Sequence, residues 1–248
     1  MDSTLKRTWA EIDLDALAHN YKTLRDRIGA NVKFLGVVKA DAYGHGSVQV
    51  SRLLQELGAD YLAVSSIDEA IELRLNDITM PILILGHTPK EQVSRLIEYN
   101  ITQAVTCKAK ALEYSEEAVK CGGTLKIHIK VDTGMGRIGF IPDDESIDEI
   151  RRISQLPNVE IDGIFTHFAC ADMADKTSMN NQFDKFKRFV LSLEEIGINI
   201  PIKHVCNSAA IIDSDDKFLN MVRSGIITYG LYPSEFVHKD RLHIEPAM

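Results

Sequence analysis

Eight short apolar segments recur along the chain, and helix-like segments separate most of them. The strand candidates are residues 33–39, 61–64, 82–85, 103–105, 124–131, 159–165, 202–206 and 221–226. Strands that alternate with helices favour a parallel sheet in the α/β class, and eight of them favour closure into a (β/α)8 barrel of the TIM type. A doubly wound open sheet is the competing fold. Apolar residues at steps of three and four over 13–28 predict an additional helix before the first strand.

The segments between the strand candidates have helical spacing of apolar residues. They are residues 48–57, 67–75, 90–99, 108–120, 145–154 and 180–196, whereas the piece after Cys206 is short and poorly defined. No repeat or Pro/Gly-rich linker interrupts the pattern. We therefore expect one barrel domain over residues 1–233. Residues 234–248 are predicted to start a linker, because 241–248 reads as the beginning of another extended segment.

Composition and charge argue against several classes of partner. The net charge is −8, and acidic and basic residues are mixed along the chain without a basic block, so nucleic acid is not an expected partner. No stretch has the apolar length of a signal-peptide core or a membrane span, so no membrane association is expected. The four cysteines form no C-x-x-C pair and are interpreted as reduced thiols. These features predict a cytoplasmic protein.

Lys39 stands at the end of the first apolar segment, directly before a turn that contains Gly44 and Gly46. A lysine at the rim of a buried parallel sheet is partly removed from water. Desolvation disfavours the ammonium form of an amine, and a neutral amine can attack a carbonyl carbon. The competing interpretation is an ordinary surface lysine on a loop.

Other reactive side chains occupy equivalent places after later strand candidates. They are Tyr43 after the first, Arg137 after the fifth, His167 after the sixth, Asn207 and Ser208 after the seventh, and Arg223 to Ile226 at the eighth. In a barrel, the carboxyl ends of all strands meet on one face, where active sites are built. The spacing therefore predicts that residues nearly 190 positions apart surround one ligand.

Residues 134–139 contain a formal G-x-G-x-x-G, which alone is a weak dinucleotide signal. A Rossmann fingerprint needs its last glycine in the first turn of a helix, but Pro142, Asp143 and Asp144 delay the next helix. We expect a loop whose glycines let the backbone approach a ligand. No H-E-x-x-H or His/Cys cluster indicates a metal, no G-x-S-x-G a hydrolase, and no P-loop a nucleotide triphosphate site.

Five segments together resemble signature segments of bacterial alanine racemases. They are Val37–Gly46, Lys130–Gly139, Thr166–Ala169, His204–Ala210 and Arg223–Ile226, and they follow the family's order. The resemblance runs from about Thr8 to the last residue. It implies a (β/α)8 barrel that binds pyridoxal 5′-phosphate. It also implies interconversion of L-alanine and D-alanine, which supplies D-alanine for peptidoglycan precursors in the cell wall.

The resemblance implies catalytic roles for four side chains. Lys39 matches the lysine that holds the cofactor, and Arg137 matches an arginine near the cofactor's phenolic oxygen and the substrate carboxylate. His167 matches a ring that stacks on the pyridine, with a structural histidine as the alternative. Arg223 matches an arginine that donates to the pyridine nitrogen, with a salt-bridged barrel arginine as the alternative. Because arginine keeps its proton, that nitrogen would stay unprotonated, which disfavours side reactions such as transamination.

The resemblance also implies a wider set of cofactor-binding and supporting residues. The cofactor-binding set is Lys39, Tyr43, Leu85, His167, Asn207, Ser208, Arg223, Gly225 and Ile226. Lys130 matches a lysine that is carbamylated in some members and orients the arginine, with a plain strand-end lysine as the alternative. His204 matches a histidine that supports the network of arginine and tyrosine. Asn207 and Ser208 equally suit the N-cap of a helix, and the two roles are compatible.

One departure from the family affects the expected activity. Family members carry a C-terminal β-domain that supplies a tyrosine base for the opposite face across a homodimer interface. Tyr229 and Tyr232 belong to the barrel and do not match it. We expect a barrel fragment that binds the cofactor and racemises alanine poorly or not at all. The alternatives are a single-domain protein for pyridoxal phosphate homeostasis, a serine racemase, and a barrel decarboxylase, which expects an acidic residue where Arg223 stands.

Overall fold

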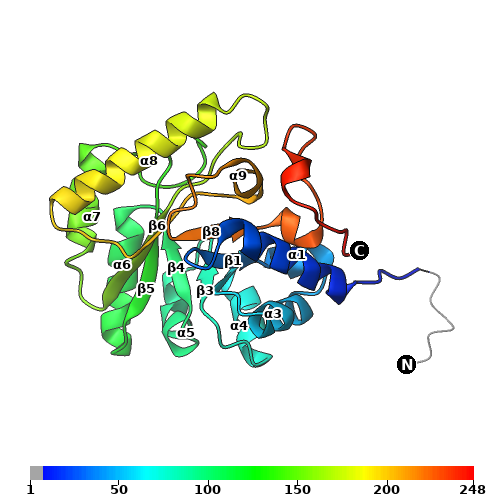
Figure 1. Cartoon of the computed structure of the whole chain (residues 1–248). Coiled ribbons are helices and arrows are strands. Elements are labelled where there is room, and N and C mark those ends of the chain that lie inside the picture. Colours follow the sequence, from blue (N-terminus) through cyan, green and yellow to red (C-terminus); the bar gives the residue numbers. More distant parts are fainter. Residues whose placement is uncertain (1–7) are drawn as a thin grey trace.

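Eight parallel strands close into a barrel in sequence order, with β8 pairing back to β1 (Figure 1). The computed structural model describes residues 8–248. The strands are β1 (Lys33–Val37), β2 (Tyr61–Val64), β3 (Ile82–Ile84), β4 (Thr102–Val105), β5 (Leu125–Lys130), β6 (Val159–Phe165), β7 (Ile202–His204) and β8 (Met221–Ser224). The predicted (β/α)8 barrel is confirmed, and the open sheet is wrong.

Helices form a layer around the barrel. They are α1 (Leu14–Ile28), α3 (Ser47–Glu56), α4 (Ile67–Leu75), α5 (Val93–Glu98), α6 (Lys108–Cys121), α7 (Asp144–Ile153) and α8 (Thr177–Glu195). Shorter pieces follow strands or loops, namely α2 (Lys39–Gly44), α9 (Ser208–Asp213) and the 3-10 turns η2 (Lys90–Gln92), η3 (Ile226–Tyr229) and η4 (Lys239–Arg241). The predicted strand over 221–226 ends at Ser224, because Gly225 turns the backbone out of the extended conformation and η3 begins.

The predicted helix before the first strand is confirmed as α1. Asp13 caps its amino terminus by accepting hydrogen bonds from the backbone amides of Asp15 and Ala16. Its apolar stripe, which includes Leu17, Tyr21 and Leu24, is buried against the neighbouring elements. The Tyr21 ring packs edge-on against Phe34 at the start of β1, with ring centroids 4.9 Å apart. This contact fixes α1 against the strand that leads to Lys39.

The barrel interior combines an apolar cluster with buried polar side chains. The apolar cluster includes Leu35, Val37, Leu83 and Met221, and it is separate from the larger core between strands and helices. The polar group is His128, Lys130, His204 and Arg223, all nearly inaccessible to solvent. Buried charged and polar groups are costly unless they are paired. Their concentration on β5, β7 and β8 therefore marks the side of the barrel that carries the site.

Residues after η3 fold back along α1 (Figure 1). The Asn20 side chain donates to the carbonyl of Glu245 at 2.8 Å and accepts from its amide at 2.7 Å. The backbone of Ala247 bonds to both Asp13 and Tyr229. Residues 242–248 have no regular secondary structure, but these hydrogen bonds hold them against α1 and the barrel. Within the described residues, none of the helices has both the length and the apolar character that a membrane crossing requires.

Candidate active site

A cavity of about 550 Å³ opens at the carboxyl-terminal mouth of the barrel. It is lined by every residue of the predicted set except His204: Lys39, Tyr43, Leu85, Lys130, Arg137, His167, Asn207, Ser208, Arg223, Gly225 and Ile226. The structure thus brings together residues from the ends of β1, β3, β5, β6, β7 and β8. His204 is fully buried directly beneath them and contacts Arg223.

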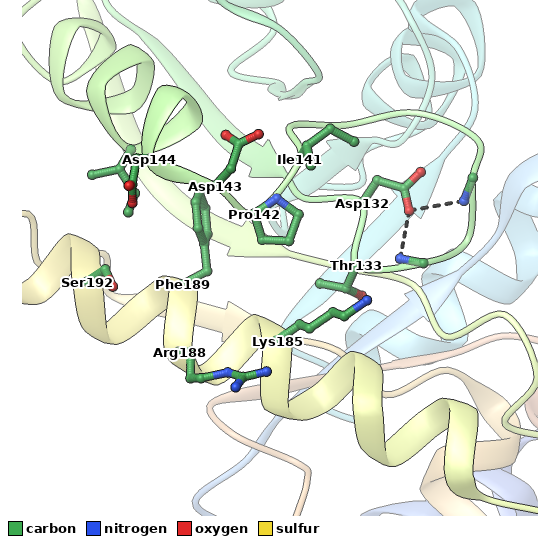
Figure 2. A pocket seen from close by; sticks show the side chains of 13 residues that line it. Asp132, Thr133, Ile141, Pro142, Asp143, Asp144, Lys185, Arg188, Phe189 and Ser192 are labelled. Carbon is green, nitrogen blue, oxygen red and sulfur yellow. Dashed lines mark hydrogen bonds between the residues drawn. The ribbon is translucent and has the colours of Figure 1, made fainter.

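A second cavity, of about 630 Å³, lies outside the barrel between residues 132–144 and α8 (Figure 2). Its walls combine the acidic Asp143 and Asp144 with Lys185 and Arg188 on α8. No residue of the predicted set lines it. The reactive side chains converge in the cavity at the barrel mouth, which is therefore the candidate site.

A left-handed turn places Lys39 and Tyr43 at the mouth. Residues 40–43 all have φ between +51° and +54°, a conformation that costs a residue with a Cβ about 1–2 kcal/mol each. Two carboxylates hold the turn: that of Glu69, on helix α4, accepts from the amide of Ala40 at 2.7 Å, and that of Asp41, within the turn, accepts from the amide of Ser47 at 2.7 Å. The surrounding structure therefore imposes this backbone, and Lys39 at its start is half-buried.

Two hydroxyl groups converge around the backbone of Gly225. The Ser208 hydroxyl accepts a hydrogen bond from the Gly225 amide at 3.1 Å. A Cβ on Gly225 would lie 3.3 Å from the Tyr43 hydroxyl and 3.4 Å from that of Ser208. Asn207 caps α9, as predicted, by accepting from the amide of Ala210 at 3.1 Å. The hydroxyls of Tyr43 and Ser208 and the backbone of Gly225, which has no side chain, therefore lie together at the wall of the cavity.

The Lys130–Gly139 segment is a loop, as expected, because α7 begins only at Asp144. The Asp132 carboxylate accepts from the amides of Gly134, Gly136 and Arg137 at 2.9–3.0 Å, and Figure 2 shows two of these bonds. A Cβ on Gly139 would lie only 2.7 Å from the carbonyl oxygen of Lys130. This tight return brings Arg137 to the cavity.

Lys130 closes the same loop from below. Its buried Nζ donates to the carbonyls of Val131 at 2.8 Å and Ile138 at 3.2 Å. Burial, together with the charge of Arg223, lowers the pKa of Lys130 to about 8. Lys130 therefore fixes both ends of the loop that carries Arg137.

His167 experiences the combined field of four cations. Burial lowers its pKa to about 3, and the charges of Arg223, Arg137, Lys130 and Lys39 act in the same direction. The imidazole is consequently neutral at physiological pH. These four cations line the cavity together with one carboxylate, that of Asp172. The wall therefore carries more positive than negative charge, and the site is suited to an anionic ligand.

Arg223 lies buried at the floor of the cavity, where burial lowers its pKa to about 10. One terminal nitrogen donates to the Nδ1 of His204 at 3.0 Å, and the other to the carbonyl of Thr166 at 2.8 Å. The second nitrogen also points to the Nδ1 of His167 at 3.4 Å. In residues 8–248, no acceptor pairs with its Nε–H, and Arg223 lines the cavity. One donor therefore remains for a ligand.

Several positioning residues escaped the sequence interpretation. Ser66 and Glu69 form a capping box, whose S-x-x-E signature is visible in the sequence. That signature gives no sign that Glu69 also reaches Ala40 across a different loop. Asp132 precedes Thr-Gly, a pattern typical of a side chain that accepts from its own loop. Among residues 8–248, no three His, Cys, Asp or Glu side chains gather as a metal site would require.

Comparison with known families gives the decisive match. The family model for "Alanine racemase, N-terminal domain" covers residues 12–233. The chain belongs to this family. The resemblance predicted from the five sequence segments is confirmed, and it accounts for the barrel and for most of the chain.

Curated alanine racemases are close to this member in sequence. The enzyme of Methanococcus maripaludis is 52% identical over 240 residues, covering 97% of the chain and 64% of the relative. The enzyme of Clostridium tetani is 51% identical over 244 residues, covering 98% of the chain and 63% of the relative. The chain thus spans less than two thirds of the length of these relatives.

Solved structures agree with this assignment. An alanine racemase of Clostridium difficile in complex with cycloserine superimposes with a TM-score of 0.97 at 47% identity, over 99% of the chain and 68% of that structure. An alanine racemase of Bacillus anthracis with bound L-Ala-P gives 0.90 at 36% identity, over 98% of the chain and 63% of that structure. These neighbours carry the alanine racemase name, and none of them favours the decarboxylase or storage interpretation.

Proposed function

We propose that the chain is the cofactor-binding barrel of an alanine racemase, which interconverts L-alanine and D-alanine with pyridoxal 5′-phosphate. One observation carries the proposal: the amine of Lys39, the hydroxyls of Tyr43 and Ser208, and the free donor of Arg223 face one cavity of about 550 Å³. A cavity of this size suits a small cofactor together with a small substrate.

The residues fit the chemical groups of this cofactor. The hydroxyls of Tyr43 and Ser208 would hold the phosphate beside Gly225, where a side chain would intrude. The unpaired Nε–H of Arg223 would donate to the pyridine nitrogen, and the neutral ring of His167 would pack against the pyridine. Leu85, Asn207 and Ile226 would complete the wall around it. When bound, the cofactor supplies a carbonyl carbon for amines and a conjugated ring that accepts electrons from the substrate.

Lys39 would hold the cofactor and carry the proton on one face of the substrate. Its position at the start of an externally held turn keeps its amine beside the ring site. Arg137 would bind the substrate carboxylate through its fork of donors. Asp132 and Lys130 hold the loop of Arg137 in place before substrate arrives, so less ordering is required on binding.

Arg223 would limit the chemistry to proton removal and return. A guanidinium keeps its own proton, so it donates to the pyridine nitrogen without protonating it. A ring whose nitrogen stays unprotonated accepts less charge from the substrate carbon. This favours prompt reprotonation over transamination.

Lys130 matches a lysine that is carbamylated in some members of the family. A carbamate nitrogen keeps only one N–H, whereas Lys130 donates to two carbonyls here. Modification would therefore release one end of the loop unless Arg137 moved to meet the new carboxylate.

The decisive experiment is reduction with borohydride after addition of pyridoxal 5′-phosphate, followed by peptide mapping. We expect a stable cofactor label on Lys39 and none in the Lys39→Ala variant. Lys33→Ala is the matched control, because Lys33 begins the same strand at its exposed end. A label on another lysine, or equal labelling of Lys39→Ala, would overturn the proposal.

The wider organisation follows from the length of the relatives. We propose that residues 1–233 are the barrel domain and that 234–248 begin the connection to a further domain, which supplies the second base in a cytoplasmic homodimer. Residues 1–248 alone would then racemise alanine slowly. Comparing L-to-D conversion by this stretch and by the product of the entire gene tests this, and equal rates would refute it.

A further inference from the structure

A line of polar side chains crosses the barrel interior beneath the cavity. His204 on β7 accepts from Arg223 through Nδ1, and its Nε2 lies 3.0 Å from the Nδ1 of His128 on β5. The Nε2 of His128 faces the carboxylate of Asp162 on β6 at 3.7 Å. The Tyr61 hydroxyl donates to the same carboxylate oxygen at 2.9 Å. The line therefore links the floor of the cavity to the partly exposed carboxylate of Asp162.

Space for this line is created by a missing side chain. Gly163 follows Asp162 on β6, and a Cβ on it would lie 2.5 Å from the His128 ring. The ring is fully buried, and its Nε2 has no hydrogen-bond partner within residues 8–248. An unpaired buried N–H is costly, so the nearby carboxylate is its natural acceptor.

The hydrogen bonds of this line have one direction. Arginine is only a donor, so in the observed orientation of the guanidinium the Nδ1 of His204 accepts and its proton resides on Nε2. That proton is donated to the Nδ1 of His128, which leaves the His128 proton on Nε2, facing Asp162. Each imidazole is thereby restricted to a single tautomer.

The ionisation states agree with this direction. Burial lowers the pKa of both histidines, that of His204 well below its ordinary value, so both rings are neutral. The contacts with His128 and Tyr61 lower the pKa of Asp162, so its carboxylate is ionised. The line thus runs from a buried cation through two neutral rings to a partly exposed anion.

A proton wire into the cavity does not fit this arrangement. To pass a proton along the line, Arg223 would have to release its own, and arginine does not do so in proteins. The line of hydrogen bonds can instead fix the orientation of the Arg223 guanidinium. If the Nδ1 of His204 were protonated, it would repel the Arg223 donor and turn the guanidinium, which also carries the Nε–H at the cavity.

We propose that His128 and Asp162 are positioning residues for Arg223: the acceptor of Asp162 sets the tautomer of His128, which sets that of His204 and thereby the orientation of the guanidinium. The functional part of this inference rests on the proposed role of Arg223 toward a pyridine ring. The tautomers themselves do not depend on that role.

The tautomers are measured by the 15N side-chain shifts of histidine in the full chain without cofactor. We expect His204 and His128 both to carry the proton on Nε2. Finding the proton on Nδ1 of either residue in the unaltered chain overturns the proposal, whatever the variants do.

The variants then test the cause. Asp162→Leu removes the acceptor and is expected to convert His128, and with it His204, away from the Nε2–H form. Asp162→Asn keeps an acceptor oxygen and is expected to keep the original tautomers. Glu160→Leu, an exposed carboxylate on the same strand, is the matched control and is expected to change neither. Unchanged shifts in Asp162→Leu would refute the proposal.

The consequence for binding is measured with pyridoxal 5′-phosphate and with inorganic phosphate. Asp162→Leu is expected to weaken pyridoxal phosphate binding about threefold to tenfold, the value of one well-placed hydrogen bond, and to leave phosphate binding unchanged. Equal weakening for both probes would indicate a general loss of structure and refute the positioning role. If the unaltered chain binds no pyridoxal phosphate, the proposed function fails while the tautomer result stands.

Discussion

The loops after β1 and β5 both bring a cation to the barrel mouth, and they solve the backbone problem differently. The β1 loop adopts left-handed φ values at Ala40–Tyr43, none of which is glycine, and besides its own Asp41 it relies on Glu69 from helix α4. The β5 loop uses glycine at its left-handed positions and a carboxylate of its own, Asp132. Strain at the first loop is held by tertiary contacts, whereas the second is locally self-sufficient. Both loops need residues with positive φ. Glycines indicate this requirement in the sequence of the β5 loop, whereas nothing in the sequence of residues 40–43 of the β1 loop indicates it.

The largest expected effect comes from removing glycine where the β5 loop returns. In Gly139→Ala the new Cβ meets the Lys130 carbonyl at 2.7 Å at a φ of +124°, so we expect the free energy of unfolding to fall by about 3 kcal/mol. Denaturation by urea measures it. Gly136→Ala is the control, because nothing lies within 4 Å of its Cβ, and it should lose only about 1 kcal/mol. Equal losses would show that steric contact does not shape this loop.

A smaller effect is expected from loosening the external support of the β1 loop. Glu69→Gln replaces one carboxylate oxygen with an amide donor that faces the amides of Ala40 or Ser65, so we expect a loss of about 2 kcal/mol and faster hydrogen exchange in residues 40–43. Glu72→Gln, on the exposed side of the same helix, should change neither. If exchange rises only in α4, the carboxylate serves the helix cap alone and the comparison between the loops loses its basis.

The buried amine of Lys130, which holds the β5 loop, predicts a pH dependence of the free energy of unfolding. Its pKa is about 8 in the folded chain and about 10.5 unfolded, so the unfolded state binds more protons between these values and stability rises with pH across that window. Below pH 8 the penalty of burying the charge is fully present. Lys130→Met should therefore remove about 2 kcal/mol of this rise, measured as the difference between unfolding free energies at pH 8 and pH 10. An identical slope in both proteins would contradict the assignment.

The architecture and the membership of the cavity could be predicted from the sequence because both follow from short-range patterns. Apolar runs gave the eight strands, and the placement of Lys39, His167 and Arg223 after such runs indicated which residues share the mouth. The contacts that hold them in place come from elsewhere in the chain. Glu69 lies beside Ala40, and Asp162 beside His128, although the members of each pair are about 30 residues apart in the chain. No local sequence pattern indicates such contacts.

The smallest expected effect tests whether the left-handed turn is strained at all. Ala40→Gly removes a Cβ at φ +51°, which relieves about 1–2 kcal/mol, while the added freedom of the unfolded chain costs about 0.5–1 kcal/mol. We therefore expect a net stabilisation of about 0.5 kcal/mol. Ala109→Gly, in the first turn of α6, should instead destabilise by up to about 1 kcal/mol. If both variants lose stability equally, the β1 loop stores no strain, and its dependence on Glu69 would reflect hydrogen bonding alone.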